Sequence, residues 1–361
     1  MSDSTAVDPT ARRKQLVRTF AGFVFPLFFV IVFPLAYVSA LHNPTPNDMP
    51  LTVVGPTAVV GKIAELLDAT DSFSVTQTDV ESRAKDDVED RSSVGSILVS
   101  VDADTHTLSM TVFTASGGGR AAAAAVQGAA NQIATQLDVV PTVKDVAPLA
   151  APDVLGTNLL FLLTYSSIGA YLLIVILTLI IPKASFAVKC ASVALASVVL
   201  PLLVFGLSSI FVGDYNASFQ EIIGVLLIDA LYVCTVGSLS ILLQNMVGQA
   251  AIFLLMGLIV FVNLPSSGGP LPVSMLPPFW QWLHSFWFGA GALEGFRSII
   301  YFHGNQAGRW VAQLAAWAVL VTSLSVVVEL FKVNRALRRR LDGNHHKHGV
   351  EALPAQPAAT A

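Results

Sequence analysis

The stretch that decides the fold is Leu155–Ile181, LGTNLLFLLTYSSIGAYLLIVILTLII, which contains no charged residue. A helix needs roughly 20 apolar residues to cross the hydrocarbon core of a bilayer, and this run is longer than that. A helix buried in a soluble protein would carry a polar stripe, and this run does not. Only 12% of the whole chain is charged, about half the usual share of a soluble domain. We therefore predict an integral membrane protein.

Similar apolar runs recur along the chain and predict an α-helical membrane protein with about six transmembrane helices. The first run follows Arg12, Arg13, Lys14 and Arg18, as a signal peptide would. It is longer than the ~7–15 apolar residues of a signal-peptide core, which favours an uncleaved anchor. The predicted spans are residues 20–41, 155–181, 190–212, 222–243, 246–264 and 310–330.

The distribution of Lys and Arg predicts the orientation. Residues 43–153 hold six basic and fifteen acidic side chains, whereas residues 332–361 hold six basic and two acidic ones. Cytoplasmic segments carry the excess of Lys and Arg, so we expect a multi-pass protein of the cell membrane with both termini in the cytoplasm. The predicted parts are a cytoplasmic N-terminus (1–19), a first transmembrane helix (20–41), an extracytoplasmic domain (42–154), a five-helix membrane domain (155–331) and a basic, disordered tail (332–361).

The extracytoplasmic segment alternates between strand and helix periods, which predicts a small α/β domain with a mixed sheet. A charged helix over Val80–Arg91 is expected to be exposed. Ser116–Arg120 lacks the Gly-Lys-Ser/Thr ending of a phosphate loop and indicates a flexible turn. The predicted strands are Leu51–Gly55, Phe73–Thr78, Ser96–Val101 and Thr107–Thr114, and the other helices are Thr57–Asp68 and Arg120–Leu137.

Residues 263–308 are expected to form a re-entrant or interfacial helical hairpin on the outer face. The segment opens with NLPSSGGPLP, which cannot be a continuous helix, and goes on to three closely spaced tryptophans that suit the headgroup layer. A helix over Ala292–Tyr301 would place Glu294 and Arg297 on one side, three residues apart. Irregular backbone at membrane depth must be covered by protein or line a water-filled cavity.

The layout resembles permeases of type-2 ABC exporters, and it is most similar to their phage-infection-protein-like branch. The resemblance rests on Asn263, Pro265, Gly268-Gly269, Leu276-Pro277, Phe279, Gly291, Glu294, Arg297 and Tyr301-Phe302. It implies a six-span subunit that pairs as a homodimer and moves hydrophobic or amphipathic substrates outward, driven by a separate cytosolic ATPase. In related permeases a coupling segment follows the second span, where this chain has only a short loop, Pro182–Lys189.

That loop is therefore the candidate docking site for an ATPase. Phe186 would insert into a groove of the partner, as a single apolar anchor often does. Lys183 and Lys189 would flank it and steer an acidic surface. The alternative is that Phe186 lies in the membrane interface and both lysines only set the topology.

Asp229 is the one charge inside the fourth span. A carboxylate at such depth costs roughly 2.5–3.5 kcal/mol on insertion scales, which calls for a reason. One interpretation is a pathway, proton or helix-coupling residue, and the other is a structural hydrogen bond to a Ser, Thr or Tyr. Glu221 begins the same span and is expected to be a helix-N-terminal acid.

The sequence carries no catalytic motif, so we expect no enzyme, no cofactor and no metal site. Asp102 and Asp104 indicate a hairpin turn, and the tract His345, His346, His348 has no further ligands. The arginines after residue 334 suit anionic lipid rather than nucleic acid. The function expected is an exporter permease subunit; the rival is a non-transporting receptor or scaffold whose outer domain binds a partner. A proton-coupled exporter using Asp229 is a third interpretation.

Overall fold

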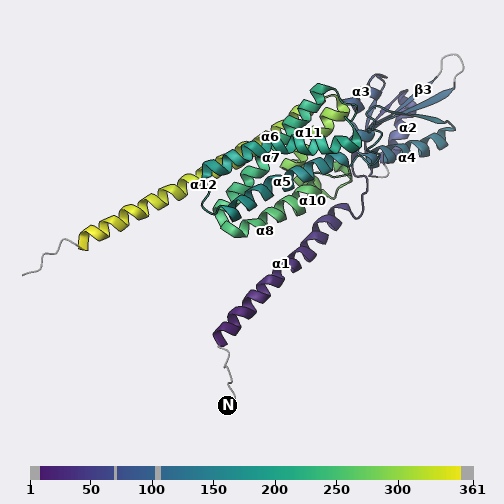
Figure 1. The fold of residues 1–361 in the computed structure, drawn as a ribbon. Coiled ribbons are helices and arrows are strands. Elements are labelled where there is room, and N and C mark those ends of the chain that lie inside the picture. Colours follow the sequence, from purple (N-terminus) through teal and green to yellow (C-terminus); the bar gives the residue numbers. More distant parts are fainter. Residues whose placement is uncertain (1–8, 69–70, 102–106, 351–361) are drawn as a thin grey trace, which may run out of the picture.

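The computed structural model describes residues 9–68, 71–101 and 107–350, and it divides into an α/β domain and a helical bundle (Figure 1). The α/β domain lies at one end of the bundle. Helices α1 (Pro9–Leu41) and α12 (Ala307–Val350) both extend toward the other end, so the two described chain ends lie on the side away from the sheet. The side chains Asp102 and Asp104 of the proposed turn lie outside the described residues.

The sheet of the α/β domain is mixed, as the sequence predicts. Its order is β2-β1-β3-β4-β5, in which only the pair β3–β4 is antiparallel. Isoleucine and valine side chains of the central strands are buried, which is typical of strands covered on both faces. The strands are β1 (Met49–Val54), β2 (Phe73–Thr78), β3 (Gly95–Val101), β4 (Leu108–Thr114) and β5 (Pro141–Asp145).

The helices of this domain cover the sheet on two sides. Val60 and Ile63 of α2 (Thr57–Asp68) share a core with Val126 and Ile133 of α4 (Arg120–Leu137). In contrast, α3 (Arg83–Glu89) lies on the side that meets the bundle. The bounds of α2 and α4 agree with the sequence-based prediction.

Helix α3 corrects one expectation, because it is shorter than the predicted Val80–Arg91 and is not simply exposed. Ala84 and Val88 are fully buried and belong to the same apolar cluster as the bundle. Asp87, also buried, accepts hydrogen bonds from Thr52 Oγ1 (2.8 Å) and Arg83 Nε (3.1 Å). The predicted exposure was wrong because the many charged residues of this segment flank a buried apolar stripe, Ala84 and Val88. The 3₁₀ turn η1 (Ser116–Gly118) follows β4.

Four helices of the described chain are long and apolar enough to cross a membrane. They are α5 (Asn158–Ile180), α6 (Phe186–Val212), α7 (Phe219–Val247) and the part of α12 between Ala307 and Arg339. Two further apolar segments, Pro26–Leu41 and Ala251–Ser266, are shorter. These helices indicate a membrane-embedded protein, and the predicted total of six spans stays a prediction.

The fifth predicted span is not one regular helix. It consists of η2 (Gly248–Ala250), α8 (Ala251–Met256), the π-helix η3 (Gly257–Asn263) and α9 (Leu264–Ser266). A π-helix shifts the backbone hydrogen-bond register and is frequent at functional positions. Helix α1 packs on this stretch, where Phe29 contacts Phe261 (ring centroids 4.9 Å apart) and Tyr37 Oη donates to the Val260 carbonyl (3.0 Å).

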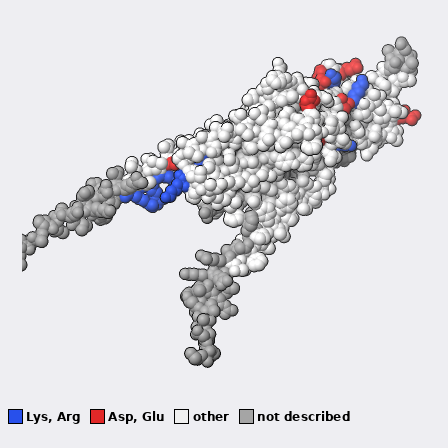
Figure 2. All heavy atoms as spheres, viewed as in Figure 1, with Lys and Arg blue, Asp and Glu red and all other residues white. Residues whose placement is uncertain are grey.

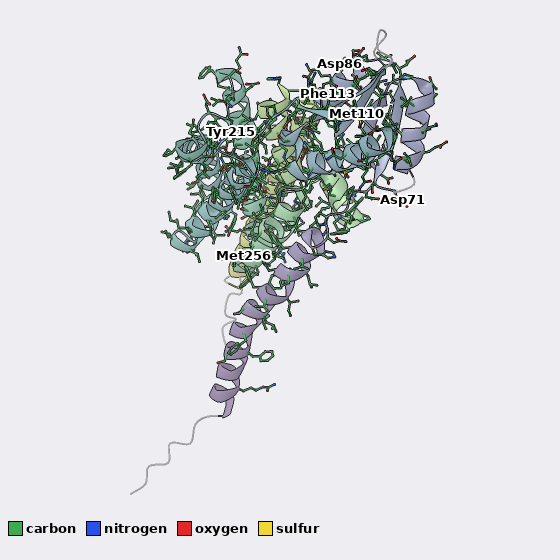
Figure 3. The ribbon with its side chains drawn as sticks, turned by 90° about the vertical axis from the view of Figure 1, so that its right-hand side faces the viewer. Asp71, Asp86, Met110, Phe113, Tyr215 and Met256 are labelled. Atoms are coloured by element: carbon green, nitrogen blue, oxygen red, sulfur yellow. The ribbon has the colours of Figure 1, made fainter. Side chains whose placement is uncertain are left out.

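The first and last helices have long stretches outside the bundle. The N-terminal part of α1 stands apart from the rest of the molecule (Figure 3), and its Phe20, Phe23 and Leu27 are exposed. Helix α12 continues as far as Val350, although we predicted disorder from residue 332. Leu, Ala and Arg, which make up residues 335–341, are among the strongest helix formers and favour the helix over that stretch.

The predicted hairpin is helical, and whether it is re-entrant or interfacial stays a prediction. After η4 (Val273–Met275) come α10 (Pro278–His284) and α11 (Phe288–Phe302). Helix α11 runs along α7: Phe288 lies against Tyr232, and Gly295 lies against Ile228. Because Tyr232 is thirteen residues into α7, the hairpin reaches ~20 Å along that helix. Fourteen of the α11 residues are buried, so protein covers this backbone throughout.

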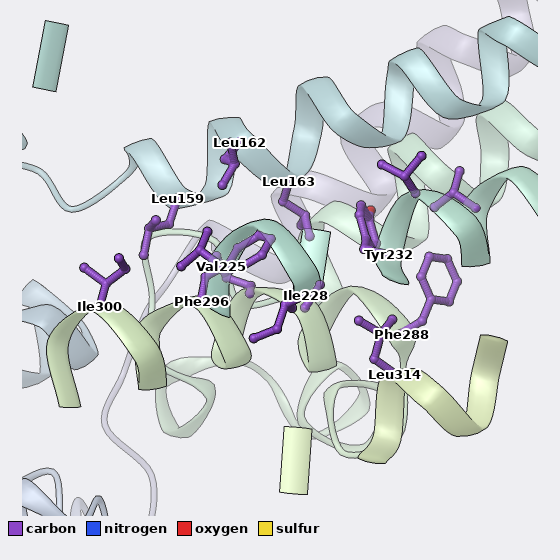
Figure 4. Close-up of a cluster of buried hydrophobic side chains, with 14 of the residues drawn as sticks. Leu159, Leu162, Leu163, Val225, Ile228, Tyr232, Phe288, Phe296, Ile300 and Leu314 are labelled. Carbon is purple, nitrogen blue, oxygen red and sulfur yellow. The ribbon is translucent and has the colours of Figure 1, made fainter. Parts of the chain in front are cut away.

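The bundle core forms where α5, α7, α11 and α12 meet (Figure 4). Leu159, Leu162 and Leu163 of α5 face Val225 and Ile228 of α7. Phe296 and Ile300 of α11 and Leu314 of α12 complete the cluster in the close-up. Burying such side chains contributes about 1.5–3 kcal/mol each relative to exposure. That figure applies to side chains transferred from water; inside a bilayer, where lipid is equally apolar, the cluster is stabilised by packing instead.

Candidate functional site

The junction between the two parts of the molecule is held by three charged side chains. Arg91, which follows α3, and Arg297 of α11 each bind one carboxylate oxygen of Glu294. The Arg297–Glu294 contact measures 2.6 Å, and the Glu294 side chain is only 6% exposed. Arg297 also donates to the Gly269 carbonyl, and Arg91 to Ser298 Oγ. We call Arg91, Glu294 and Arg297 the junction triad; it ties the α/β domain, called the outer domain after its predicted location, to the hairpin formed by α10 and α11.

The electrostatics of the junction triad keep Glu294 ionised. Burial by itself raises the pKa of a carboxyl group, but the guanidinium groups of Arg297 and Arg91 outweigh it and hold the pKa of Glu294 at about 2. The triad therefore carries a net charge of one positive unit at neutral pH. Buried charges of this kind persist only when they are paired and hydrogen-bonded.

A cavity of about 360 Å³ opens beside the junction triad, between the outer domain and the hairpin. Arg91 and Glu294 form one part of its wall, and Phe302 and Trp310 contribute aromatic surface. The guanidinium of Arg309 lies over the Trp310 ring, 4.8 Å from the centroid. This junction cavity combines apolar walls with a cation that makes no ion pair within the described chain.

His284 lines the same cavity and leaves one ring nitrogen without a protein partner. Its Nδ1 lies 2.9 Å from the Ser266 carbonyl, which can only accept, so Nδ1 carries the hydrogen. Burial lowers the pKa of His284, which keeps the ring neutral. Nε2 is then an acceptor, and no donor among the described residues reaches it. Nε2 is thus a buried acceptor beside the junction cavity.

Asp229 lies away from the junction, inside the bundle. It is ten residues into α7 and 1% exposed. Ser166 Oγ of α5 donates to its Oδ2 (2.7 Å), and Oδ1 has no partner among the described groups. The structural hydrogen bond expected for this residue is therefore present. The unpartnered Oδ1 is the atom through which Asp229 would act in transport, the other interpretation of this residue.

One turn further along α7, a second polar contact joins three elements. Asn263, the last residue of η3, donates from Nδ2 to Tyr232 Oη (2.7 Å). Gly289 at the start of α11 makes room for that amide, because a Cβ there would lie 2.1 Å from Asn263 Oδ1. The π-helix, α7 and the hairpin are thus fixed to one another near the middle of α7.

The predicted docking loop lies at the opposite end of the bundle. Lys183 is exposed, whereas Phe186 is half-buried against Ile174, Val193 and Ile241. Lys189 is buried, at 9% exposure, and faces a cleft of about 440 Å³. Of the two lysines, therefore, only Lys183 is accessible on the surface, whereas Lys189 is buried beside the cleft. We call this second hollow the inner cleft.

At the outer end of α7, Glu221 is the helix-N-terminal acid that the sequence predicts. It forms a capping box with Ser218, with Ser218 N donating to Glu221 Oε2 (2.7 Å). Such reciprocal bonds satisfy backbone groups at the first turn of a helix. His303 Nδ1 lies 3.0 Å from the other oxygen, so the acid also contacts the end of α11. Glu221 is therefore accounted for structurally.

The structure brings some predicted site residues together and adds others. Glu294 and Arg297 pair as their spacing suggested, and Phe186 and Lys189 line the inner cleft together. Arg91 and His284 were missed. Arg91 lies 203 residues before Glu294 in the chain, and no local pattern connects the two.

Nothing in the described part of the chain resembles a metal site, since no three His, Cys, Asp or Glu side chains cluster there. Comparisons with protein-family models, curated proteins and solved structures found no match for this chain. What the protein does must therefore be argued from its own residues.

Proposed function

We propose that this chain is the membrane permease subunit of an exporter for hydrophobic or amphipathic molecules. The observation that supports the proposal most directly is the junction cavity. Aromatic walls from Phe302 and Trp310 and the cation of Arg309 suit a molecule with one apolar and one polar part. The cavity lies between the α/β domain and the hairpin, which is the exit from the bundle if the predicted orientation holds.

The energy source in this proposal is a separate cytosolic ATPase, with the permease acting as a homodimer, as in the type-2 ABC exporters that the layout resembles. The contact would use the loop before α6. Lys183 is exposed and suited to an acidic partner, and Phe186 lies directly behind it. The junction triad would then carry motion of the bundle to the outer domain, because Arg91 binds Glu294 and Ser298 of α11.

The test is native extraction of the complex in a mild detergent, followed by mass spectrometry and an ATPase assay. We expect an ATPase to co-purify, and we expect Lys183→Glu to weaken its retention by reversing the charge of an exposed side chain. Phe186→Asp should abolish retention. Because Phe186 also packs in the bundle, its variant counts only if its thermal midpoint matches that of the wild type. A homodimer without ATPase and without nucleotide-dependent transport would contradict the proposal.

A second candidate, a receptor or scaffold that transports nothing, is favoured by one feature of the outer domain. A groove of about 340 Å³ runs between α2 and α4, and Leu66, Gly128 and Gln132 are among the residues that line it. Such a groove suits a partner segment. Gly128→Trp should fill it, because nothing lies within 4 Å of an added Cβ. Loss of function in this variant, with Arg309→Gln and Lys183→Glu fully active, would favour the receptor.

A further inference from the structure

The inner cleft lies beside the loop that the exporter proposal uses for docking, and it has the geometry of a separate binding site for a small charged group. It measures about 440 Å³ and is walled by the end of α5, the loop before α6, the end of α7 and α12. In Figure 1 these elements meet at the end of the bundle opposite the sheet. A single water occupies ~30 Å³, so the cleft has room for a polar group of considerable size.

Lys189 is the unexplained group in this cleft. Its side chain is 9% exposed, yet no Asp or Glu of the described chain pairs with it within 4.0 Å. A buried charge is costly unless it is paired. The arrangement therefore calls for an anion from outside the chain.

The cleft contains two ammonium groups, Lys189 and Lys332, and one carboxylate, Glu329, so one positive charge is left without a counter-charge. Lys332 of α12 contributes a second ammonium group, and two like charges facing one cleft repel each other. The nearby acid, Glu329, accepts a hydrogen bond from Asn245 Nδ2 (3.3 Å). An anion between Lys189 and Lys332 would relieve their repulsion and satisfy both.

The surroundings of the inner cleft point to a lipid as the source of that anion. On one side lie exposed apolar side chains, with Leu179 at 60% and Phe331 at 71% exposure. On the other side the exposed basic residues of α12 begin, and Figure 2 shows this collar of Lys and Arg beside the uncharged middle of the molecule. The cleft thus lies where apolar surface changes to basic surface, as expected of a site for lipid headgroups. Basic pockets between helices on the cytoplasmic side bind anionic headgroups.

We propose that the inner cleft binds the phosphodiester headgroup of an anionic phospholipid of the cytoplasmic leaflet, held between Lys189 and Lys332 with its acyl chains along Leu179 and Phe331. The lipid would fill the gap between the loop before α6 and α12. It would then be a structural cofactor of the inner end, whether or not an ATPase docks there.

The test is native mass spectrometry of the full chain extracted from nanodiscs of phosphatidylcholine with a graded share of phosphatidylglycerol. We expect the wild type to retain one phosphatidylglycerol in zwitterionic detergent. Lys189→Gln with Lys332→Gln should bind it about thirtyfold more weakly, since each lysine near an anionic surface contributes an energy worth about fivefold. Lys189→Arg with Lys332→Arg should restore retention, which separates a charge effect from misfolding.

The matched control is Arg335→Gln with Arg338→Gln. It also removes two positive charges, but from the exposed surface of α12, the helix that carries Lys332. This variant should keep the retained lipid. Equal retention by the wild type and the double lysine variant would overturn the proposal. Inorganic phosphate or glycerol 3-phosphate is the second arm: displacement of the lipid by millimolar phosphate would assign the cleft to a soluble phosphate and overturn the lipid as its ligand.

Discussion

Glu294 illustrates how the sequence defines a contact only in part. Its spacing from Arg297 on a helix predicts an intrahelical pair, and that pair forms. The second partner, Arg91, comes from a distant loop, where its backbone adopts the left-handed region (φ 64°). The spacing of residues on a helix predicts which side chains three or four residues apart are neighbours. It cannot predict contacts between separate domains. The pair could be predicted from sequence, whereas the junction it builds required the fold.

The first prediction concerns Glu294→Gln. Removing the carboxylate leaves Arg91 and Arg297 buried without a counter-charge, which typically costs about 3–5 kcal/mol. We expect a clear drop in the thermal midpoint of the purified protein at pH 7. The control is Lys85→Gln, which removes one partner of an exposed pair with Glu89 and should leave the midpoint almost unchanged.

The same variant gives a pH dependence with a definite sign. The pKa of Glu294 lies at about 2 in the folded protein, below its usual 4.5, so ionisation stabilises the fold above pH 4.5 and the gain is lost as the pH falls toward 2. The midpoint difference between the wild type and Glu294→Gln should be constant from pH 8 to 5 and shrink below 4.5. A difference that already shrinks between pH 7 and 6 would contradict this assignment.

The second prediction concerns Asp229→Asn. The amide oxygen of Asn can accept the Ser166 hydrogen bond as the carboxylate does, and the neutral side chain is cheaper to insert into a membrane. We expect normal expression and assembly. The rate at which cells export amphipathic dyes should fall by at least about tenfold. Ser166→Ala is the control, since it leaves the charge but removes its partner and should lower stability. Full export by Asp229→Asn would eliminate a transport role for the residue.

At the scale of elements, periodicity predicted the long helices well and the irregular ones poorly. The apolar run 246–264 indicates a span, but hydropathy cannot distinguish an α-helix from the π-helix η3, which depends on contacts with α1 and α11. Strand β5 was missed because its five residues, PTVKD, are short and mostly exposed. It forms only because β4 offers a parallel edge, with Val112 opposite Val143. Both misses are cases in which tertiary contacts decide the local structure.

The third prediction tests the contact between Asn263 of η3 and Gly289 of the hairpin. In Gly289→Ala the new methyl group would overlap Asn263 Oδ1, so the amide must move and release Tyr232. Overpacking of this kind costs about 1–3 kcal/mol, and we expect a lower thermal midpoint. Gly206→Ala is the matched control on α6, where an added Cβ meets nothing within 4 Å. It should be neutral or slightly stabilising, because Ala is the better helix former.

At the scale of the whole molecule, the charge pattern agrees with the shape. The view in Figure 2 shows acidic and basic side chains together at the α/β domain and mainly basic ones at the far end, with an uncharged middle between them. The sequence predicted this segregation because the sign of charge in each segment needs no fold to be counted. It could not predict how tightly the outer domain sits on the bundle, where Tyr301 packs directly against Gly117.

The last prediction tests the orientation that this pattern implies. In a background in which Cys190 and Cys234 are replaced by Ser, single cysteines are placed at Ser92 and Ser185, both exposed. Positive residues mark the cytoplasmic side, so an impermeant thiol reagent on intact cells should label position 92 of the outer domain and not position 185 of the loop before α6. Both positions should react after the cells are opened, which controls for accessibility. Labelling of position 185 alone on intact cells would invert the protein in the membrane, place the inner cleft outside, and remove the basis for an ATPase at Lys183.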